Sequence, residues 1–214
     1  MNAPARITLV SELSPAPAGE TSHPDHVVAV VVLASAAVYA TLRYNVFKGV
    51  PWSDWPGYIA DKVIAVAALL LVALAGWRKF RGRGSTVVLM AWAGVLVIGH
   101  VVLSLGLFPG GYFDKFMTGG RATATGGMSL LTGALAVGLL ELGARRASGW
   151  APRGVTVSMV GLLGLSAVHT AAPGLAGWFE PRSWPGELPP LTLIASVPAL
   201  FVAAMLTRQR GLWR

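Results

Sequence analysis

The sequence predicts an all-α fold, a polytopic membrane protein built as a bundle of six transmembrane helices. Its 214 residues are 54% hydrophobic and only 12% charged, whereas a soluble domain carries about 25% charged residues. The apolar residues form continuous runs close to the roughly 20 residues that a helix needs to cross a bilayer. Only helices and closed barrels satisfy the backbone within lipid, and these runs lack the alternation of barrel strands.

Six spans are expected, at about residues 26–43, 58–77, 86–107, 126–145, 153–173 and 189–207. The third stops before the helix breaker that begins at Phe108-Pro109, and the fifth ends at Pro173-Gly174. Residues 1–25 are polar and contain prolines, and they lack the features of a signal peptide. We expect them to form a flexible cytoplasmic tail, and residues 208–214 to form a short basic cytoplasmic C-terminus.

The fourth span has small residues at alternating spacings of three and four: Gly126, Ser129, Gly133 and Ala136. Small residues at this spacing line one face of a helix and let a neighbouring helix approach closely. This face is therefore expected to be a helix-packing surface.

Lysine and arginine predict the orientation of the bundle. One set of span ends carries eleven of them: Arg6, Arg78, Lys79, Arg81, Arg83, Arg145, Arg146, Arg153, Arg208, Arg210 and Arg214. The other set carries six: Arg43, Lys48, Lys62, Lys115, Arg121 and Arg182. Because cytoplasmic loops are richer in these residues, both termini are expected inside the cell, with the protein in a bacterial inner membrane.

The net charge of +8 follows from this loop bias, so nucleic acid is not expected as a partner. The expected partners are the lipid bilayer and a redox protein or membrane complex. Cysteine is absent, which excludes disulfides, iron–sulfur clusters and covalently attached c-type haem.

Two of the four histidines, His100 and His169, lie inside apolar spans. An ionisable side chain at membrane depth is costly, and it is by default a functional candidate. His100 lies about 10 Å and His169 about 6 Å from the outer ends of their spans, at the rise of an α-helix. Because the third and fifth spans run in the same direction, both imidazoles are expected at similar depth in the outer leaflet.

Two imidazoles at one depth suit the axial ligands of a single b-type haem. Gly99, Gly161 and Gly164 are expected to leave room for a flat cofactor. A bare ion such as zinc is less favoured, because it needs three or four protein ligands and we expect no acidic side chain at this depth. Asp61 is expected at the interface.

Three basic residues near the outer ends of the spans are candidate partners for the haem propionates: Arg43, Lys62 and Arg121. Each is also of a type that commonly snorkels to the interface without any ligand.

The segment from Arg83-Gly84 through His100 to Ser104, followed by Phe108-Pro109 and Tyr112–Phe116, resembles the third span of ferric-reductase-like transmembrane domains. His169, Trp178 and the segment from Trp184 to Leu191 resemble the partner region. The resemblance covers about residues 58–207. It implies six helices, haem b and electron transfer across or within the membrane.

Many members of that family carry a second haem, held by another histidine pair on the same two spans. Here Thr86 and Val155 stand at those positions, so the resemblance implies a single-haem variant. It is closer to the six-helix metalloreductases of animals, or to the haem subunit of the bacterial methionine sulfoxide reductase system.

These observations predict a membrane-embedded b-type cytochrome with one bis-histidine haem near the outer face. It would transfer electrons from a quinol, a flavin or a partner protein to an acceptor on the outer side. The sequence contains no nucleotide-binding glycine fingerprint, so NAD(P)H would require a separate subunit. Two alternatives remain: a cofactor-free accessory or scaffold subunit of a larger membrane complex and, ranked last, a transporter.

Overall fold

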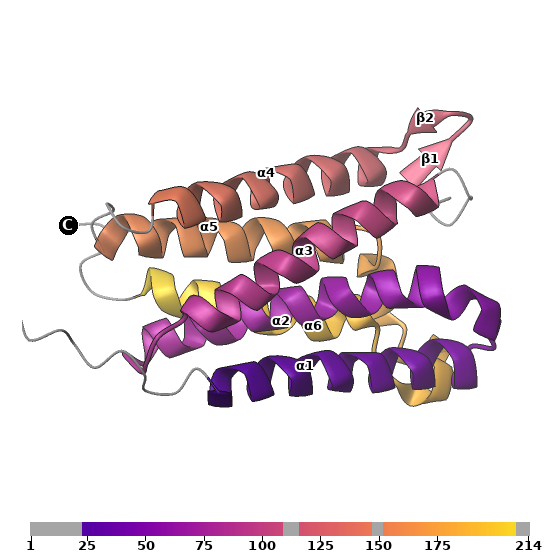
Figure 1. Ribbon diagram of the computed structural model, residues 1–214. Coiled ribbons are helices and arrows are strands. Elements are labelled where there is room, and N and C mark those ends of the chain that lie inside the picture. The colour runs from indigo at the N-terminus through magenta and orange to yellow at the C-terminus, as the bar shows by residue number, and fades with distance from the viewer. Residues whose placement is uncertain (1–22, 109–115, 147–151, 209–214) are drawn as a thin grey trace, which may run out of the picture.

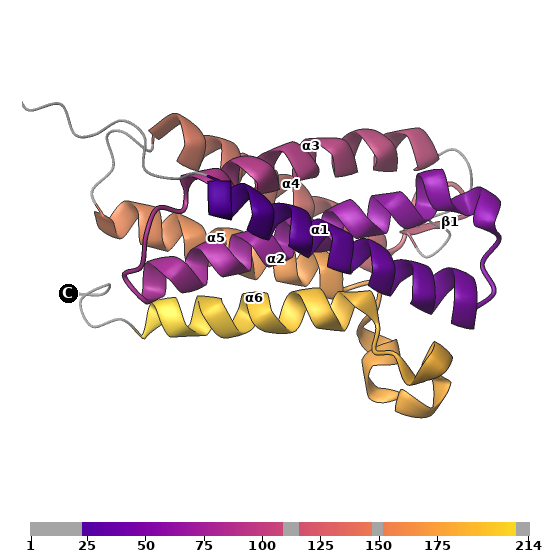
Figure 2. The same cartoon turned by 60° about the horizontal axis from the view of Figure 1, so that its bottom comes forward.

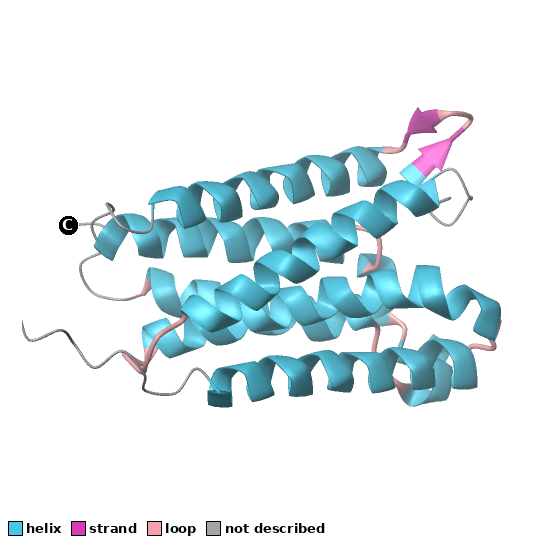
Figure 3. Ribbon diagram, in the orientation of Figure 1, coloured by secondary structure: helices cyan, strands magenta, loops and turns pink. Residues whose placement is uncertain are grey.

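The computed structural model describes residues 23–108, 116–146 and 152–208, and helices dominate all three ranges (Figure 3). The long helices are α1 (His23–Thr41), α2 (Ala60–Phe80), α3 (Val87–Leu107), α4 (Ala124–Arg146), α5 (Pro152–Ala171) and α6 (Leu191–Thr207). Six described segments are long and apolar enough to cross a membrane. The all-α, six-helix fold class is therefore confirmed, and the predicted spans differ from the helices by only a few residues at most ends.

Shorter elements extend or connect these helices. Between α1 and α2 lie η1 (Leu42–Phe47), η2 (Trp52–Asp54) and η3 (Trp55–Ile59). The strands β1 (Met117–Thr118) and β2 (Arg121–Ala122) pair as an antiparallel hairpin. Between α5 and α6 lie η6 (Leu175–Phe179), η7 (Pro181–Ser183) and η8 (Pro185–Glu187).

The six helices run back and forth between two ends of the bundle (Figure 1). At one end, α2 finishes with Arg78 and Lys79 in its last turn and α3 begins; we call this the basic end. The opposite end, where α3 finishes and the hairpin leads into α4, is the loop end. The first described residue and the end of α6 both lie at the basic end (Figure 1).

Parts of the predicted terminal segments lie outside the described residues, namely residues 1–22 and 209–214, as does the helix breaker from Pro109 onward. Helix α1 begins three residues before the predicted span, at His23. Asp25, which we expected in the tail, lies in the first turn of α1 and forms an ion pair with Arg78 at 2.6 Å.

Helix α2 is the central helix and packs against α1, α3 and α6. It is rich in small residues, and Ala67, Ala75 and Gly76 are among its buried positions. A Cβ atom added at Gly76 would lie 2.8 Å from Val202 of α6. Small side chains therefore allow the other helices to surround α2 closely, since lipid supplies no hydrophobic drive for helix association and close packing must replace it.

Helix α5 packs between α4 and α6, whereas α3 packs mainly against α2 and more lightly against α1. Among the described residues, α3 is not closely packed against either α4 or α5. An interval thus separates α3 from the α4–α5 pair. The outer surface of α3 is apolar. Val95, Ile98 and Leu105 are each more than 60% exposed, as expected for a helix that faces lipid.

At the loop end, the connection between α5 and α6 folds back onto the end of α1 (Figure 2). The Tyr39 hydroxyl donates a hydrogen bond to the Pro189 carbonyl at 2.7 Å, and Arg43 Nη1 donates to the Leu188 carbonyl. The ring of Phe47 covers Gly186. These contacts anchor the segment from η6 to η8 to the extension of α1.

Candidate functional site

His169 lies in the last turn of α5 and faces α4. Its Nδ1 atom is 2.7 Å from the backbone carbonyl oxygen of Ser129, and the Ser129 hydroxyl donates to the His169 carbonyl at 2.9 Å. A Cβ atom added at Gly133 would lie 2.7 Å from His169 Nδ1. The predicted small-residue face of α4 is therefore the surface on which the imidazole of His169 packs.

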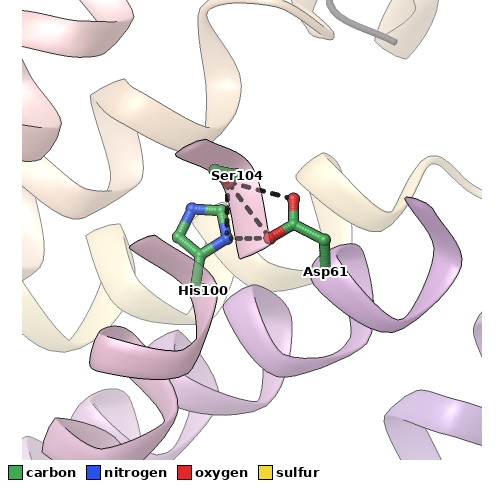
Figure 4. A network of polar contacts seen from close by, with 3 residues as sticks. All are labelled: Asp61, His100 and Ser104. Atoms are coloured by element: carbon green, nitrogen blue, oxygen red, sulfur yellow. Dashed lines mark hydrogen bonds and ion pairs between the residues drawn. The ribbon is translucent and has the colours of Figure 1, made fainter. Parts of the chain in front are cut away.

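His100 lies in α3 and faces α2, where it meets a buried carboxylate (Figure 4). Its Nδ1 atom is 2.8 Å from Asp61 Oδ1. The Ser104 hydroxyl, one helical turn beyond His100, lies 3.1 and 3.2 Å from the two Asp61 oxygens. The Asp61 side chain is only 4% exposed, and among the described residues His100 and Ser104 are its hydrogen-bond partners.

The partners of Nδ1 fix the tautomer of both rings. A carbonyl oxygen and a carboxylate oxygen can only accept hydrogen bonds, so Nδ1 of each histidine carries the proton. In a neutral imidazole the other nitrogen, Nε2, then has a free lone pair. Within the described part of the chain, all hydrogen bonds of the two rings run through Nδ1. Both Nε2 atoms are therefore suited to bind a metal.

The two imidazoles lie across the interval between α3 and α5, with ring centroids 6.0 Å apart and planes at 70°. Two imidazoles on opposite sides of one metal ion have centroids roughly 6 Å apart, because each metal–nitrogen bond measures about 2 Å. Each ring plane contains its own metal–nitrogen bond, so the two planes are free to differ in direction. The expected juxtaposition of His100 and His169 is present.

Asp61 corrects the sequence-based expectation. We expected no acidic residue at the depth of the histidines, and this expectation is wrong, because the buried Asp61 contacts His100. The second helical segment begins at Trp52, six residues before the predicted span. This extension places Asp61 well inside the segment rather than near its end. The sequence signal was the pair Trp55-Pro56, since proline is common in the first turn of a helix.

Ser104 and Ser129 are the other polar residues that sequence reasoning did not connect to the histidines. Ser104 follows His100 by four residues, the spacing that places two side chains on one helix face. That spacing could have identified Ser104. Ser129 was recognised only as a small residue, because its contact with His169 depends on how α4 and α5 pack.

The structure separates the three candidate propionate partners. Lys62 Nζ lies 4.1 Å from the centre of the Tyr58 ring and 5.7 Å from that of Tyr44, and Arg43 also lies over Tyr44. Arg43 is buried and bonded to the Leu188 carbonyl. Arg121 is exposed in the hairpin. Arg43 and Lys62 thus share an aromatic environment at the loop end, and Arg121 lies apart from them.

The glycines expected to make room for a cofactor differ in their surroundings. A Cβ atom at Gly99 would contact Ile64, and one at Gly161 would lie 2.9 Å from Leu139. These two glycines bring helices together. A Cβ atom at Gly164 would meet nothing within 4 Å, so only this position opens onto space.

The remaining described histidine with a placed side chain, His26, lies at the basic end. It is exposed, and its Nδ1 atom accepts a hydrogen bond from Trp92 Nε1 at 2.9 Å. Trp92 of α3 therefore contacts α1.

A comparison with protein-family models finds no match, and neither does a comparison with curated protein sequences.

Proposed function

We propose that this protein is a membrane-embedded b-type cytochrome that carries one haem between α3 and α5, with His100 and His169 as axial ligands. One observation carries the proposal: two imidazoles at a separation of 6.0 Å, each held through Nδ1 so that Nε2 keeps its lone pair. A hydrogen bond from Nδ1 to a carboxylate or carbonyl orients metal-binding histidines in the same way.

The donor set fits haem better than it fits a bare metal ion. In the described ranges, no group of three or more His, Asp, Glu or Cys side chains is arranged to hold a metal ion. Haem needs only two protein ligands, since its porphyrin supplies four nitrogens to the iron. The loose packing of α3 against α4 and α5 is consistent with a flat group between these helices.

Haem, when bound, supplies one-electron chemistry at its iron. The chain's own residues orient the ligands and fix the position of the site along the bundle. His100 lies about 20 Å along α3 from Val87 at the basic end, at the helical rise of about 1.5 Å per residue. The site is thus nearer the loop end, where the electron acceptor would bind, and a quinol, a flavin or a partner protein would be the donor.

The same proposal includes the family and the cellular setting. The chain would be a single-haem variant of the ferric-reductase-like transmembrane domains, in a bacterial inner membrane with both termini in the cytoplasm. Arg43 and Lys62 at the loop end, and Arg121 in the hairpin, remain candidate partners of the propionates.

The test is an absorption spectrum of the purified protein, oxidised and reduced with dithionite. We expect a Soret band and a reducible α band that are lost or strongly weakened in His100→Ala and in His169→Ala. His26→Ala is the matched control, because His26 is exposed at the opposite end of the bundle; its spectrum should match that of the unsubstituted protein.

The alternative is an accessory subunit without a cofactor, for which the two free Nε2 lone pairs have no role. It predicts co-purification with large partners and an unchanged complex when both histidines are replaced. Absence of reducible bands in the protein expressed with ample haem, or bands unaffected by both histidine substitutions, would contradict the cytochrome and favour this alternative.

A further inference from the structure

We infer that Asp61 is a positioning residue that holds His100 and lowers the reduction potential of the metal centre. The inference rests on the proposed function, since it concerns the group bound by His100 and His169. It assigns different roles to the two ligands: His100 is the ligand backed by a negative charge, and His169 is the ligand backed by neutral groups.

In this proposal Asp61 is an ionised carboxylate that accepts hydrogen bonds from His100 and Ser104. Nδ1–H of His100 donates to Oδ1 at 2.8 Å, and the Ser104 hydroxyl donates to the carboxylate at 3.1 and 3.2 Å (Figure 4). Acceptance from two donors is the pattern of an ionised carboxylate. The equivalent partner of His169 is the neutral carbonyl of Ser129.

Charge balance connects this carboxylate to the bound group. An acidic side chain at membrane depth is stable only when it is paired with a compensating charge. Among the described residues, no lysine or arginine forms an ion pair with Asp61, and His100 is the side chain that pairs with it. A ferric haem held by two neutral imidazoles has a net positive charge on its iron–porphyrin core. Ligation by a neutral His100 would therefore place a positive charge next to the Asp61–His100 pair.

The consequence for the potential follows from the change in charge. Reduction to the ferrous state removes the positive charge that Asp61 stabilises, so the carboxylate favours the oxidised form. The hydrogen bond also makes His100 a more strongly donating ligand, which acts in the same direction. The site is accordingly built as a low-potential centre, suited to pass electrons onward rather than to retain them.

Two substitutions should move the midpoint potential in opposite directions. Asp61→Asn keeps an oxygen acceptor for His100 but removes the charge, so it should raise the midpoint potential. At a fixed voltage the ferric-to-ferrous ratio should change about tenfold or more. That change corresponds to about 59 mV for a one-electron couple. Ser104→Ala removes a competing donor, which concentrates the carboxylate on His100 and should lower the potential. A general packing defect would not give opposite signs.

The experiment is a potentiometric titration of the purified holoprotein, with electron paramagnetic resonance of the ferric state to report the ligand field of the imidazoles. Asp54→Asn is the matched control. Asp54 lies in η2, before α2 at the loop end, and its hydrogen bond is with Ser53 and not with His100. Asp61→Glu, which keeps the charge, should stay close to the potential of the unsubstituted protein and serves as the readout if Asp61→Asn does not retain haem.

The outcomes separate the two proposals. A protein without haem, or with haem that both histidine substitutions leave unchanged, overturns the cytochrome itself. The second outcome is haem that depends on both histidines, with the potential and resonance spectrum unchanged in Asp61→Asn and Ser104→Ala. This outcome overturns the role of Asp61 and leaves the cytochrome standing. If Asp61→Asn retains no haem, Asp61→Glu decides the question. A rise of its midpoint potential by about 59 mV or more, although the charge is kept, also overturns the role of Asp61.

Discussion

At the scale of single residues, the site depends on what each imidazole leaves free. Side-chain and backbone acceptors hold Nδ1 of His100 and His169 and thereby direct Nε2 toward a further ligand. Burying these polar groups costs less because each has a hydrogen-bond partner. Asp61 has two donors, and the Ser129 hydroxyl donates to the His169 carbonyl. Buried polar networks are stable only when their members are satisfied in this way.

Gly133 provides a test of this arrangement at His169. In Gly133→Ala, the new Cβ would lie 2.7 Å from Nδ1 and 3.0 Å from Cε1 of His169, so the ring must move and lose its bond to Ser129. A broken buried hydrogen bond costs about 1–3 kcal/mol, which should exceed the gain of about 0.5–1 kcal/mol from replacing a helical glycine by alanine. We expect lower thermal stability and a lower haem content, measured by a melting curve and by absorbance.

Gly138→Ala is the matched control on the same helix. Nothing lies within 4 Å of a Cβ atom at Gly138, so this substitution should leave haem content unchanged and stability equal or slightly higher. Equal behaviour of the two variants would show that the ring of His169 does not depend on the small-residue face.

At the scale of elements, sequence patterns gave the helices well but placed the boundary before α2 too late. The third, fourth and fifth spans were predicted within about two residues because apolar runs, glycine and proline mark helix ends locally. The start of the second span was missed because Pro56 and Gly57 usually interrupt a helix. Residues Trp52–Ile59 nevertheless remain helical as η2 and η3. That error moved Asp61 toward the end of the predicted span, although its contact with His100 depends on how α2 and α3 pack.

The segment from η6 to η8 is the second element that the sequence did not resolve. Gly186 and Glu187 both have left-handed backbone angles, with φ of 59° and 60°. Indole nitrogens fix the segment internally: Trp178 donates to Thr192 and Trp184 to the Gly177 carbonyl, each at 2.8 Å. These tryptophans fit the aromatic belt expected at the membrane interface, and here they also shape the loop.

Gly186→Ala should destabilise this segment. A side chain at φ of 59° costs about 1–2 kcal/mol, and the added Cβ would lie 2.4 Å from the Phe47 ring. We expect a lower midpoint of thermal unfolding and faster proteolysis between α5 and α6. Gly177→Ala, at an open position without a left-handed angle, should behave like the unsubstituted protein; an equal loss in both variants would argue against the Phe47 contact.

At the scale of the whole molecule, helix alternation places both described ends of the chain at the basic end. The exposed apolar surfaces of α1 and α3 are suited to lipid, and the buried carboxylate and histidines lie within the bundle. This is the arrangement expected when lipid, not water, surrounds a fold.

Reporter fusions test the orientation that the basic residues predict. Alkaline phosphatase fused after Arg214 should be inactive and a fluorescent protein there should be bright, because the basic residues predict that this end faces the cytoplasm. Phosphatase fused after Gly119, in the hairpin turn, should be active. The reverse pattern would contradict the predicted orientation and place the histidine pair nearer the cytoplasmic face.

The sequence by itself determined the number of helices and their approximate bounds, and it predicted the orientation of the bundle and the depth of His100 and His169. These properties depend on the length of apolar runs and on the helical rise, which are local. Only the tertiary structure decided that Asp61 and Ser104 face His100, that Ser129 and Gly133 receive His169, and that Arg43 bonds to the Leu188 carbonyl. Such contacts depend on the rotation of each helix about its axis and on which helices become neighbours, and packing between distant parts of the chain sets both.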